Sequence, residues 1–474
     1  MGRLYVSFHI VKHRRPMLLR AWLDITAGWL PAFPQQRSLR RAVRLALGTL
    51  CAFGRRTLSR AICAVGLQHV DWSAEYLLFA RCRWYIDDLF QPILQKGLPF
   101  CSDAYVAVAM DDTRLHKTGR KIQSAFYQRD PLSPKFRVNL MFGLRFLQMS
   151  LLVPLYRGQQ QSARALPVRF VEVPAVKKPG KKASPEEKLA WKQKTRELNL
   201  STRSVEVART LRTSLDAAGA ADRILLLVGD NSFCNRTHFR AEWDRTELIV
   251  RARRDLKLCR RAPLGGPRFY DSTKFTPLDG YQDQSIVWKK AKIFHGGRWR
   301  MLRYKDVTNV FWQTGAGQKP LRLLVVAPIP YHVGGSKRRS HRDPAFLLTT
   351  DLRAPAGHLL QPYFDRWQIE VNHREEKDTL GVGQAQVRSL QSVPRQPAFA
   401  VAAYSALLLA GLLAYGADRT DDYEPLPKWR RGAKRPSCLD WLTVLRTEMA
   451  ENPDLLQPFG IHPDWISLGK TAAA

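Results

Sequence analysis

The sequence predicts a mixed α/β protein, and three observations lead to this prediction. Apolar residues recur at helical spacing within residues 1–100, short apolar runs typical of strands begin at Ala104, and strand-like and helix-like segments then alternate. With 474 residues and 45% hydrophobic content, the chain can bury at least one large core. The composition therefore excludes a disordered basic tail.

The formal net charge of +35 favours a polyanionic partner, which means a nucleic acid or an anionic membrane. The charge is unevenly spread along the chain. Residues 1–60 hold 12 Lys or Arg against one acidic residue, and residues 251–350 hold 21 against six. We therefore expect these two regions to make most of the contacts with a nucleic acid.

The cysteines and the apolar segments indicate the compartment. Seven scattered cysteines without a C-x-x-C pair are typical of a reducing cytosol. The N-terminus lacks the uninterrupted apolar region of a signal peptide, so export is not expected. Residues 397–416 are long enough to cross a bilayer, but the stretch is Ala-rich and stands alone, and we expect a buried core helix there.

Four regions are expected along the chain. Residues 1–100 form a helical N-terminal domain, and their Arg density favours DNA binding over packing alone. An α/β core is expected in residues 101–254 and 346–395, interrupted by a β-rich insertion in residues 255–345. Residues 396–474 form a C-terminal helical region.

Within the core, three strands come first, in AYVAVAM, FRVNLMFGLRF and QMSLLVPLY, and they look like antiparallel neighbours. A lysine-rich segment then leads into a helix at Pro185, because Ser184 and Glu187 make a capping box. We expect this segment to be solvated, with DNA contact as the alternative. A helix, the apolar strand RILLLVGD, a polar helix, the strand ELIVRAR and finally a long charged helix near residues 355–378 follow.

Acidic residues stand where strands end. Asp111 and Asp112 follow the apolar run AYVAVAM, and Asp230 ends RILLLVGD. In open α/β sheets ligands bind beside the carboxyl ends of the strands, although a single Asp there often only caps a turn. Strand alternation turns only one of Asp111 and Asp112 inward.

The long charged helix carries four polar residues on one face. Tyr363, Arg366, Glu370 and Lys377 are spaced by three, four and seven residues. One interpretation is an amphipathic helix in which Arg366 and Glu370 form an ordinary ion pair. The other is a metal site, because two Asp and one Glu that converge need cations to stay ionised, and Mg²⁺ or Mn²⁺ prefers carboxylate oxygen.

These motifs resemble those of one family. The spacing Tyr363-x2-Arg366-x3-Glu370-x6-Lys377 is similar to the Y-R-E-K signature of bacterial DDE transposases of the insertion sequence four superfamily. The triplet Asp111–Thr113 resembles the D-x-T of the first catalytic acid, and VGDNSF around Asp230 resembles the strand of the second. The resemblance covers about residues 100–395.

The resemblance implies an RNase H-like (retroviral-integrase-like) core in which Asp111, Asp230 and Glu370 are catalytic and bind two Mg²⁺ or Mn²⁺ ions. Tyr363, Arg366 and Lys377 would contact DNA phosphates. A bacterial, cytoplasmic, nucleoid-associated enzyme is implied that binds terminal inverted repeats, cleaves DNA and joins the 3′-hydroxyl to target DNA, with a homodimer holding both ends. The D-x-T match favours Asp111 over Asp112. A non-catalytic DNA-binding relative and an RNase H-like nuclease remain alternatives.

The expected insertion offers further contacts with DNA. Lys337, Arg338 and Arg339 form a basic run with Arg342 in a Gly-rich turn, where phosphate contact is expected. Trp288, Trp299 and Trp312 either stack on a base or pack in the core of the insertion.

Overall fold

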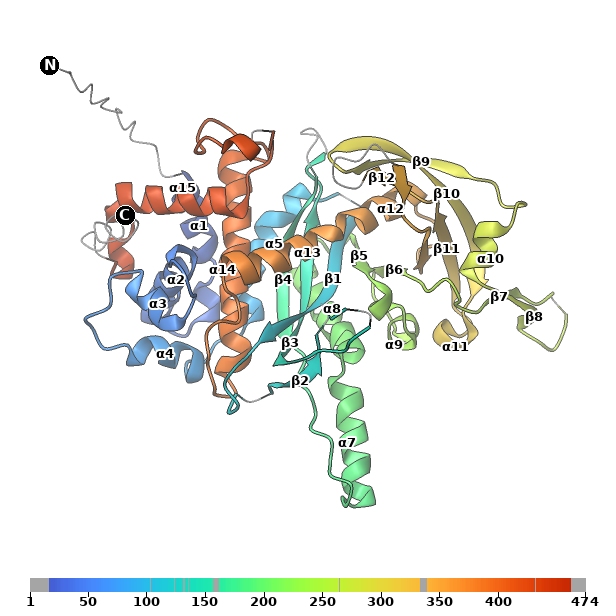
Figure 1. Cartoon of the computed structure of the whole chain (residues 1–474), viewed down its shortest axis with the longest axis horizontal. Coiled ribbons are helices and arrows are strands. Elements are labelled where there is room, and N and C mark those ends of the chain that lie inside the picture. Colours follow the sequence, from blue (N-terminus) through green and yellow to red (C-terminus); the bar gives the residue numbers. More distant parts are fainter. Residues whose placement is uncertain are drawn as a thin grey trace.

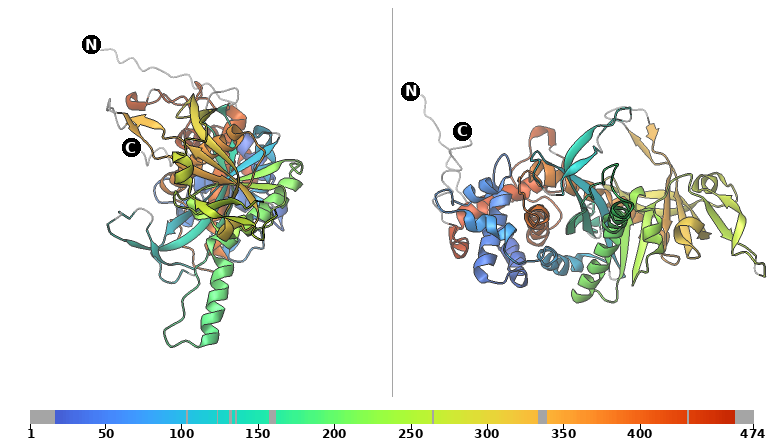
Figure 2. Two further views of the ribbon diagram at one scale, coloured as in Figure 1. Left: turned by 90° about the vertical axis from the view of Figure 1, so that its right-hand side faces the viewer. Right: turned by 90° about the horizontal axis from the view of Figure 1, so that it is seen from below.

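In the computed structural model, residues 17–461 are described except 103, 123, 131–132, 135, 157–161, 264, 333–338 and 431. They form a mixed α/β structure around a twelve-stranded mixed sheet (Figure 1), and the predicted α/β class is confirmed. The helical N- and C-terminal regions lie at one end of the long axis, and the strands of the expected insertion lie at the other (Figures 1 and 2).

The sheet runs in the order β2-β3-β1-β5-β6-β14-β11-β10-β7-β8, with β4 beside β3 and β9 beside β10, while β12 and β13 pair separately. The strands are β1 (Tyr105–His116), β2 (Phe126–Arg129), β3 (Leu140–Val153), β4 (Arg164–Glu172), β5 (Ile224–Gly229), β6 (Thr246–Arg251), β7 (Leu258–Arg261), β8 (Tyr270–Phe275), β9 (Lys289–His295), β10 (Arg298–Phe311), β11 (Pro320–Val326), β12 (Pro330–His332), β13 (Arg339–His341) and β14 (Ala345–Thr349).

The centre of the sheet combines both strand directions. β1 is antiparallel to β3 and parallel to β5, and β5 is parallel to β6. β14 then pairs antiparallel with both β6 and β11, so the strands of the expected insertion continue the same sheet. The strands β1, β5 and β6 therefore send their carboxyl ends to one edge, as parallel neighbours do.

Two of the predicted strands are one. The segments FRVNLMFGLRF and QMSLLVPLY were expected to be neighbours, but β3 runs unbroken from Leu140 to Val153. The third antiparallel strand is β4, which the sequence pattern did not predict. Pro167 and two buried arginines, Arg164 and Arg169, interrupt its apolar run, and the register with β3 shifts at Met149 and Ser150, which accommodates the proline at an irregularity.

The helices are α1 (Met17–Ala27), α2 (Gln36–Cys51), α3 (Leu58–Cys63), α4 (Ser73–Ala80), α5 (Gln91–Gly97), α7 (Pro185–Leu198), α8 (Leu200–Ala217), α9 (Arg236–Arg240), α10 (Pro277–Gln282), α11 (Gln313–Ala316), α12 (Ala356–Asp365), α13 (Trp367–Arg374), α14 (Ser392–Tyr415) and α15 (Cys438–Glu451). A π-helical turn, Glu375–Thr379, follows α13. The long charged helix expected near residues 355–378 is thus α12, α13 and this turn in succession.

The two faces of the sheet pack against different helices. On one face Ala109 of β1 and Val228 of β5 share an apolar cluster with Ile369 of α13. On the other face Val108 and its alternate neighbours belong to the cluster that contains Leu211 of α8. The odd-numbered residues of β1 and the even-numbered residues of β5 therefore face α13.

α14 is the centre of the helical end. The Trp22 indole donates to the carbonyl of Ala403 at 3.3 Å, and Trp29 lies 5.9 Å from the ring of Phe399. Within the described residues α14 alone is long and apolar enough to cross a membrane, and 83% of its most apolar window is buried inside the protein. The predicted buried core helix is confirmed. The expected boundary between residues 395 and 396 falls inside α14, and the division into domains stays a prediction.

Candidate metal and DNA site

Asp111 and Asp230 point toward α13 from neighbouring strands. The pairing of β1 with β5 ends at Ala109 and Val228, Asp111 lies two residues further along β1, and Asp230 directly follows the end of β5. Because side chains alternate along a strand, both carboxylates share the face on which Ala109 and Val228 meet α13. Glu370, the third expected acid, is in the first turn of α13.

The carboxyl group of Asp111 is largely withdrawn from water. Its pKa is raised to about 7, mainly by burial and also by the nearby carboxylates of Asp230 and Asp112, while the guanidinium of Arg366 opposes the increase. Its Oδ1 accepts a hydrogen bond from the backbone N–H of Asp112 at 2.8 Å. At neutral pH an additional cation beside Asp111 would stabilise its ionised form.

Asp230 is within electrostatic reach of both other acids. It caps the short turn Asn231–Phe233, where its Oδ1 accepts from the backbone N–H of Ser232 at 2.8 Å. Burial raises the pKa of Glu370, and the Asp230 carboxylate adds to this effect. Arg366 opposes it, since its Nη2 lies 3.2 Å from Oε1 of Glu370. Asp230 thus interacts electrostatically with Asp111 and with Glu370.

Asp112 has a different environment. Its Oδ2 accepts from Nε of Arg145 at 2.8 Å and lies 3.7 Å from Nη1 of Arg114. Asp112 is an even number of residues from Val108 on β1, so strand alternation places its side chain on the same face as Val108, away from α13. Of the two neighbouring acids, Asp111 is therefore the one whose pKa Asp230 raises, and Asp112 is the one paired with arginines.

His373 was missed by the sequence reasoning. Its Nδ1 lies 4.0 Å from Oδ2 of Asp111, and burial lowers its pKa to about 3, so the ring is neutral. In the described part of the chain its buried Nε2 has no hydrogen-bond partner. The available signal was its position three residues after Glu370, on the same side of the helix.

The fit of this site to a divalent cation rests on the acids themselves. Among the residues that the structure describes, no three His, Cys, Asp or Glu side chains are grouped closely enough to hold a metal ion. Burial raises the pKa of Asp111 and of Glu370, and the Asp230 carboxylate adds to both increases. Carboxylate oxygens are the ligands that Mg²⁺ or Mn²⁺ prefers, so Asp111 and Asp230 could hold such an ion, whereas Glu370 is paired with Arg366.

A cleft of about 510 Å³ is lined by Tyr363 and by Arg366, the ion-pair partner of Glu370, and none of the three acids lines it. Burial raises the pKa of Tyr363, and the charges of Arg251 and Arg366 oppose this. Two further arginines line the cleft. Arg342 belongs to the predicted basic run, whereas Arg251 was missed, although it ends the strand ELIVR beside Asp230's strand. The remaining lining residues are His295, Val326, Ala327, Ile329, Tyr331, His341, Asp343, Ala345, Phe364 and Trp367.

Lys377, the last residue of the four-residue pattern, lies in the π-helical turn. Burial lowers the pKa of its ammonium group, while Glu376 and Asp111 oppose this. Lys377 is therefore close enough to Asp111 to interact with it, although the wider π turn departs from the regular helix assumed in the spacing argument.

The basic run of the insertion is only partly described. Lys337 and Arg338 lie outside the described residues. Arg339 is the first residue of β13, where it pairs with His332 of β12, and its side chain lies outside the described part. Phosphate contact by these three residues stays a prediction.

The three tryptophans differ in exposure. Trp312 is 9% exposed and packs edge-on against Phe239, so it belongs to the core. Trp299 is 38% exposed and contacts Phe294 and Tyr156. Trp288 lies under the charged groups of Arg303 and Lys305. Trp299 is therefore the more exposed ring, with Lys292 over it, and stacking on a base by either residue stays a prediction.

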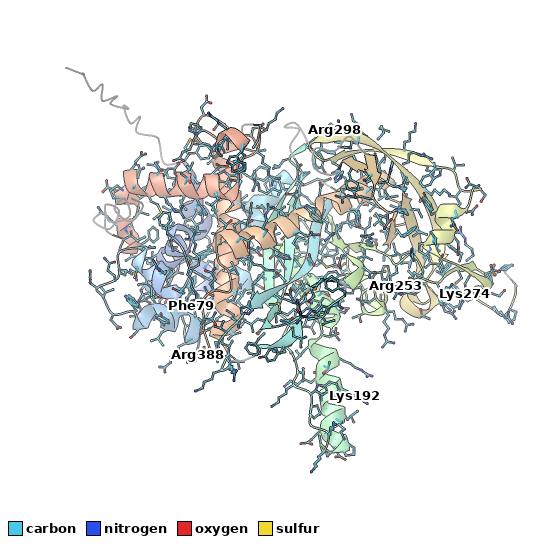
Figure 3. The ribbon with its side chains drawn as sticks, in the orientation of Figure 1. Phe79, Lys192, Arg253, Lys274, Arg298 and Arg388 are labelled. Carbon is cyan, nitrogen blue, oxygen red and sulfur yellow. The ribbon has the colours of Figure 1, made fainter. Side chains whose placement is uncertain are left out.

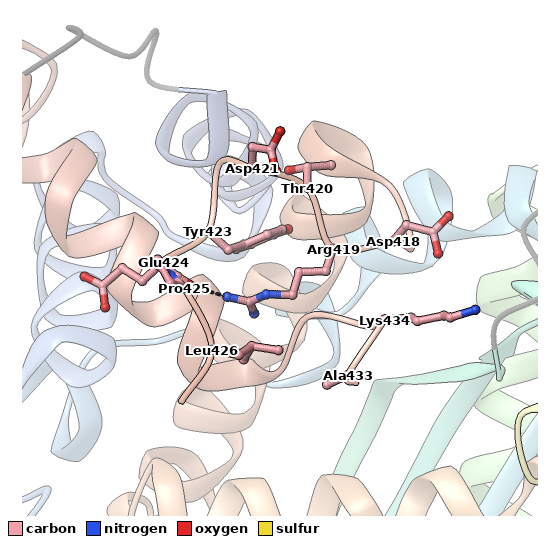
Figure 4. Close-up of a pocket in the computed structure, with 10 residues that line it drawn as sticks. All are labelled: Asp418, Arg419, Thr420, Asp421, Tyr423, Glu424, Pro425, Leu426, Ala433 and Lys434. Atoms are coloured by element: carbon pink, nitrogen blue, oxygen red, sulfur yellow. Dashed lines mark hydrogen bonds between the residues drawn. The ribbon is translucent and has the colours of Figure 1, made fainter. Parts of the chain in front are cut away.

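A second hollow, of about 880 Å³, lies within the loop after α14 (Figure 4). Arg419 occupies its centre, where the guanidinium donates to the carbonyl of Glu424 and lies 2.8 Å from Asp440. The charged group of this arginine is thus already held by partners of the chain itself. None of the predicted site residues lines it.

No protein-family model matches the chain, and no curated protein sequence does.

Proposed function

We propose that the chain is a DDE transposase of the insertion sequence four superfamily. In this proposal it cleaves DNA at the ends of its own element and joins the freed 3′-hydroxyl to target DNA. The observation that supports the proposal most is the arrangement of Asp111, Asp230 and Glu370, which come from β1, β5 and α13 and interact electrostatically. The match of Tyr363, Arg366 and Lys377 around Glu370 supports it independently.

The proposed core fold is RNase H-like. It comprises the antiparallel strands β4, β3 and β1, followed by the parallel strands β5 and β6. Acids at β1 and after β5, with a third on the helix that covers the same face, are consistent with this fold. The strands β7–β13, within residues 255–345, would then be the insertion that such transposases carry.

Each residue has a proposed task. Asp111, Asp230 and Glu370 would hold two Mg²⁺ or Mn²⁺ ions, which supply charge stabilisation for an in-line phosphoryl displacement. Arg366, Tyr363 and the arginines of the cleft would hold the DNA backbone, because a guanidinium matches phosphate geometry. Lys377 would offset part of the negative charge beside Asp111.

The proposed partner is double-stranded DNA, and a homodimer would hold two ends, in the nucleoid of a bacterial cytoplasm. The concentration of positive charge in residues 1–60 and 251–350 supports contacts on both sides of the acids. If six to ten phosphates are neutralised, end binding weakens by roughly 10³ to 10⁵ between about 50 and 200 mM salt.

The test uses the purified chain with Mg²⁺ and DNA that carries the inverted repeats flanking its gene. We expect strand cleavage at the repeat ends, and Asp230→Asn and Glu370→Gln should abolish cleavage while end binding persists. Both substitutions keep the side-chain size and remove the charge. Glu206→Gln, on the exposed surface of α8, is the matched control and should cleave normally. Equal cleavage by all variants would exclude the proposal.

A non-catalytic DNA-binding protein is the second candidate, and one observation favours it. Glu370 is already paired with Arg366, and in the described part of the chain no three side chains of metal-ligating type are grouped closely enough to hold an ion. This candidate predicts salt-sensitive DNA binding that is the same with Mg²⁺ and with EDTA, and no cleavage. An RNase H-like nuclease would instead cut without joining.

A further inference from the structure

The segment between β4 and α8 forms an arm that projects from the body of the protein (Figures 1 and 2). We define the arm as residues 174–199. Its helix, α7, buries none of its residues. The arm depends on local contacts instead, since Ser184 and Glu187 exchange the two hydrogen bonds of a capping box at 3.1 and 2.8 Å.

The two halves of the arm pack on each other through one aromatic residue. The indole N–H of Trp191 donates to the carbonyl of Val176 at 3.2 Å, and the ammonium of Lys178 lies 5.9 Å from the Trp191 ring. This contact fixes the first half of the arm along one side of α7. The other sides of the helix face solvent.

The exposed surface of the arm is strongly basic. It carries eight Lys or Arg against three Glu. In the part of the chain that the structure describes, none of these eight cations forms an ion pair, whereas Arg41 and Arg44 of α2 both pair with Glu75. We call them the arm cations: Lys177, Lys178, Lys181, Lys182, Lys188, Lys192, Lys194 and Arg196.

Three arm cations form a stripe along α7. Lys188, Lys192 and Arg196 are four residues apart, so they fall within roughly 80° of one another around the helix. Figure 3 labels Lys192 on the projecting helix. Successive members rise by about 6 Å, which is close to two base-pair steps of about 3.4 Å. Glu186 and Glu197 lie on the opposite side together with Lys194 by the same geometry, so neither glutamate interrupts the stripe.

The arm leaves the sheet at the end where the acids lie. Glu172, the last residue of β4, is opposite Phe146 of β3, and Phe146 is opposite Thr113 of β1. Thr113 is two residues beyond Asp111. Because strands are about 4.8 Å apart, the root of the arm lies roughly 10 Å from β1. A duplex held at the acids would therefore extend near the arm.

We propose that the arm binds the phosphate backbone of duplex DNA outside the segment held at the acids. The inference rests on the proposed function, because that function brings a long duplex to this edge. α7 is about 21 Å long and would follow about six base pairs. A second copy of the chain is a poorer occupant, since Leu189 is the exposed large apolar residue that α7 offers.

The test is a triple variant, Lys188→Gln, Lys192→Gln and Arg196→Gln, measured in EDTA with a 40-base-pair duplex of random sequence. We expect the slope of log affinity against log salt to fall by about 2 to 3, because each lost phosphate contact removes about 0.9. Affinity at about 100 mM salt should fall by at least tenfold. The double variant Glu186→Gln and Glu197→Gln is the matched control and should bind no more weakly than the unmodified chain.

The result can be separated from that of the proposed function. No Mg²⁺ is present, so binding is measured independently of catalysis. If the triple variant binds DNA more weakly but the unmodified chain shows no Mg²⁺-dependent cleavage, the transposase proposal is rejected and the arm inference stands. Unchanged thermal unfolding of the triple variant shows that the fold is intact. An unchanged salt slope would overturn the inference. A larger loss of affinity for single-stranded RNA than for the duplex would also overturn it.

Discussion

Arg366 and Glu370 form an ion pair one turn apart on the helix that covers the acids, with 3.2 Å between Nη2 and Oε1. The same guanidinium lowers the pKa of Asp111, so it is a shared neighbour of two of the three acids. Such a pair would be worth only a few tenths of a kcal/mol on an exposed helix. Its position beside the acids makes Arg366 a competitor of any cation that binds there.

Replacement of Arg366 by Gln should therefore have opposite effects on ion binding and on cleavage. Removal of one positive charge should tighten Mn²⁺ binding at pH 8 by about 1 kcal/mol, roughly fivefold in Kd, with water-like screening. DNA cleavage should fall, because the proposed phosphate contact is lost. Titration calorimetry and a cleavage assay check the two parts. Arg374→Gln, on the exposed side of α13, is the control; equal effects of the two substitutions would contradict the prediction.

Divalent-ion affinity should depend on pH through Asp111. Burial and the neighbouring carboxylates raise the pKa of this group to about 7, and its proton must leave before the carboxylate can bind a cation. Below pH 7 the ionised fraction falls about tenfold per unit, so Mg²⁺ should bind progressively more weakly from pH 7 to 5 and level off above pH 8. Calorimetry at several pH values checks this, and Asp111→Asn should remove the dependence.

The same group predicts a trend in the stability of the ion-free chain. The native pKa of Asp111 is about 7, and its ordinary value is 3.8. Between these values the native state holds a proton that the unfolded state has released. The free energy of unfolding should therefore fall as pH rises from about 4 to 7, and Asp111→Asn should flatten that part of the curve. Urea unfolding in EDTA measures it; an equal slope in both proteins would contradict the assignment.

The sequence located the candidate acids more easily than the sheet around them. Strand-end positions and helical spacing singled out Asp111, Asp230 and Glu370, because local rules govern both signals, and their binding of a metal stays a prediction. The pairing of β14 with β6 and β11 depends on residues about a hundred positions apart, which no local pattern encodes. β4 was hidden because Arg169 is buried through contacts with Asp87 and Ser214, distant partners that a periodicity count cannot see.

Asn372 should be important for both stability and the position of Glu370. Its amide donates to the carbonyl of Ala165 at 3.1 Å and to the hydroxyl of Tyr404 at 3.0 Å, and its Oδ1 accepts from Ser150 at 3.2 Å. These buried bonds tie α13 to β3, β4 and α14. Asn372→Ala removes these three buried bonds, although Tyr404 still bonds to Glu375 and Ser150 to Gln148, and should cost about 1–3 kcal/mol in urea unfolding.

The matched comparison for this network is Ser150→Ala, which leaves the bonds from Asn372 to Ala165 and Tyr404 in place. It should cost less stability than Asn372→Ala and change cleavage less. If both substitutions lowered cleavage equally at equal stability, Asn372 would not have the positioning role that its contacts indicate.

Close packing of α14 against α15 gives the last prediction. A Cβ on Gly411 would lie 2.2 to 2.6 Å from ring atoms of Trp441, which is fully buried. The Trp441 indole is also held by its hydrogen bond to the hydroxyl of Tyr423 at 2.9 Å, so the ring cannot move away freely. Gly411→Ala should therefore lower the free energy of unfolding by about 1–3 kcal/mol, despite the better helix propensity of Ala.

Gly357→Ala in α12 is the matched control, because nothing lies within 4 Å of its added Cβ, and it should be neutral or stabilising by up to about 1 kcal/mol. Combination of Gly411→Ala with Trp441→Leu should cost less than the sum of the two single changes, since the smaller side chain relieves the overlap. Strict additivity in urea unfolding would show that α14 and α15 do not pack in this way.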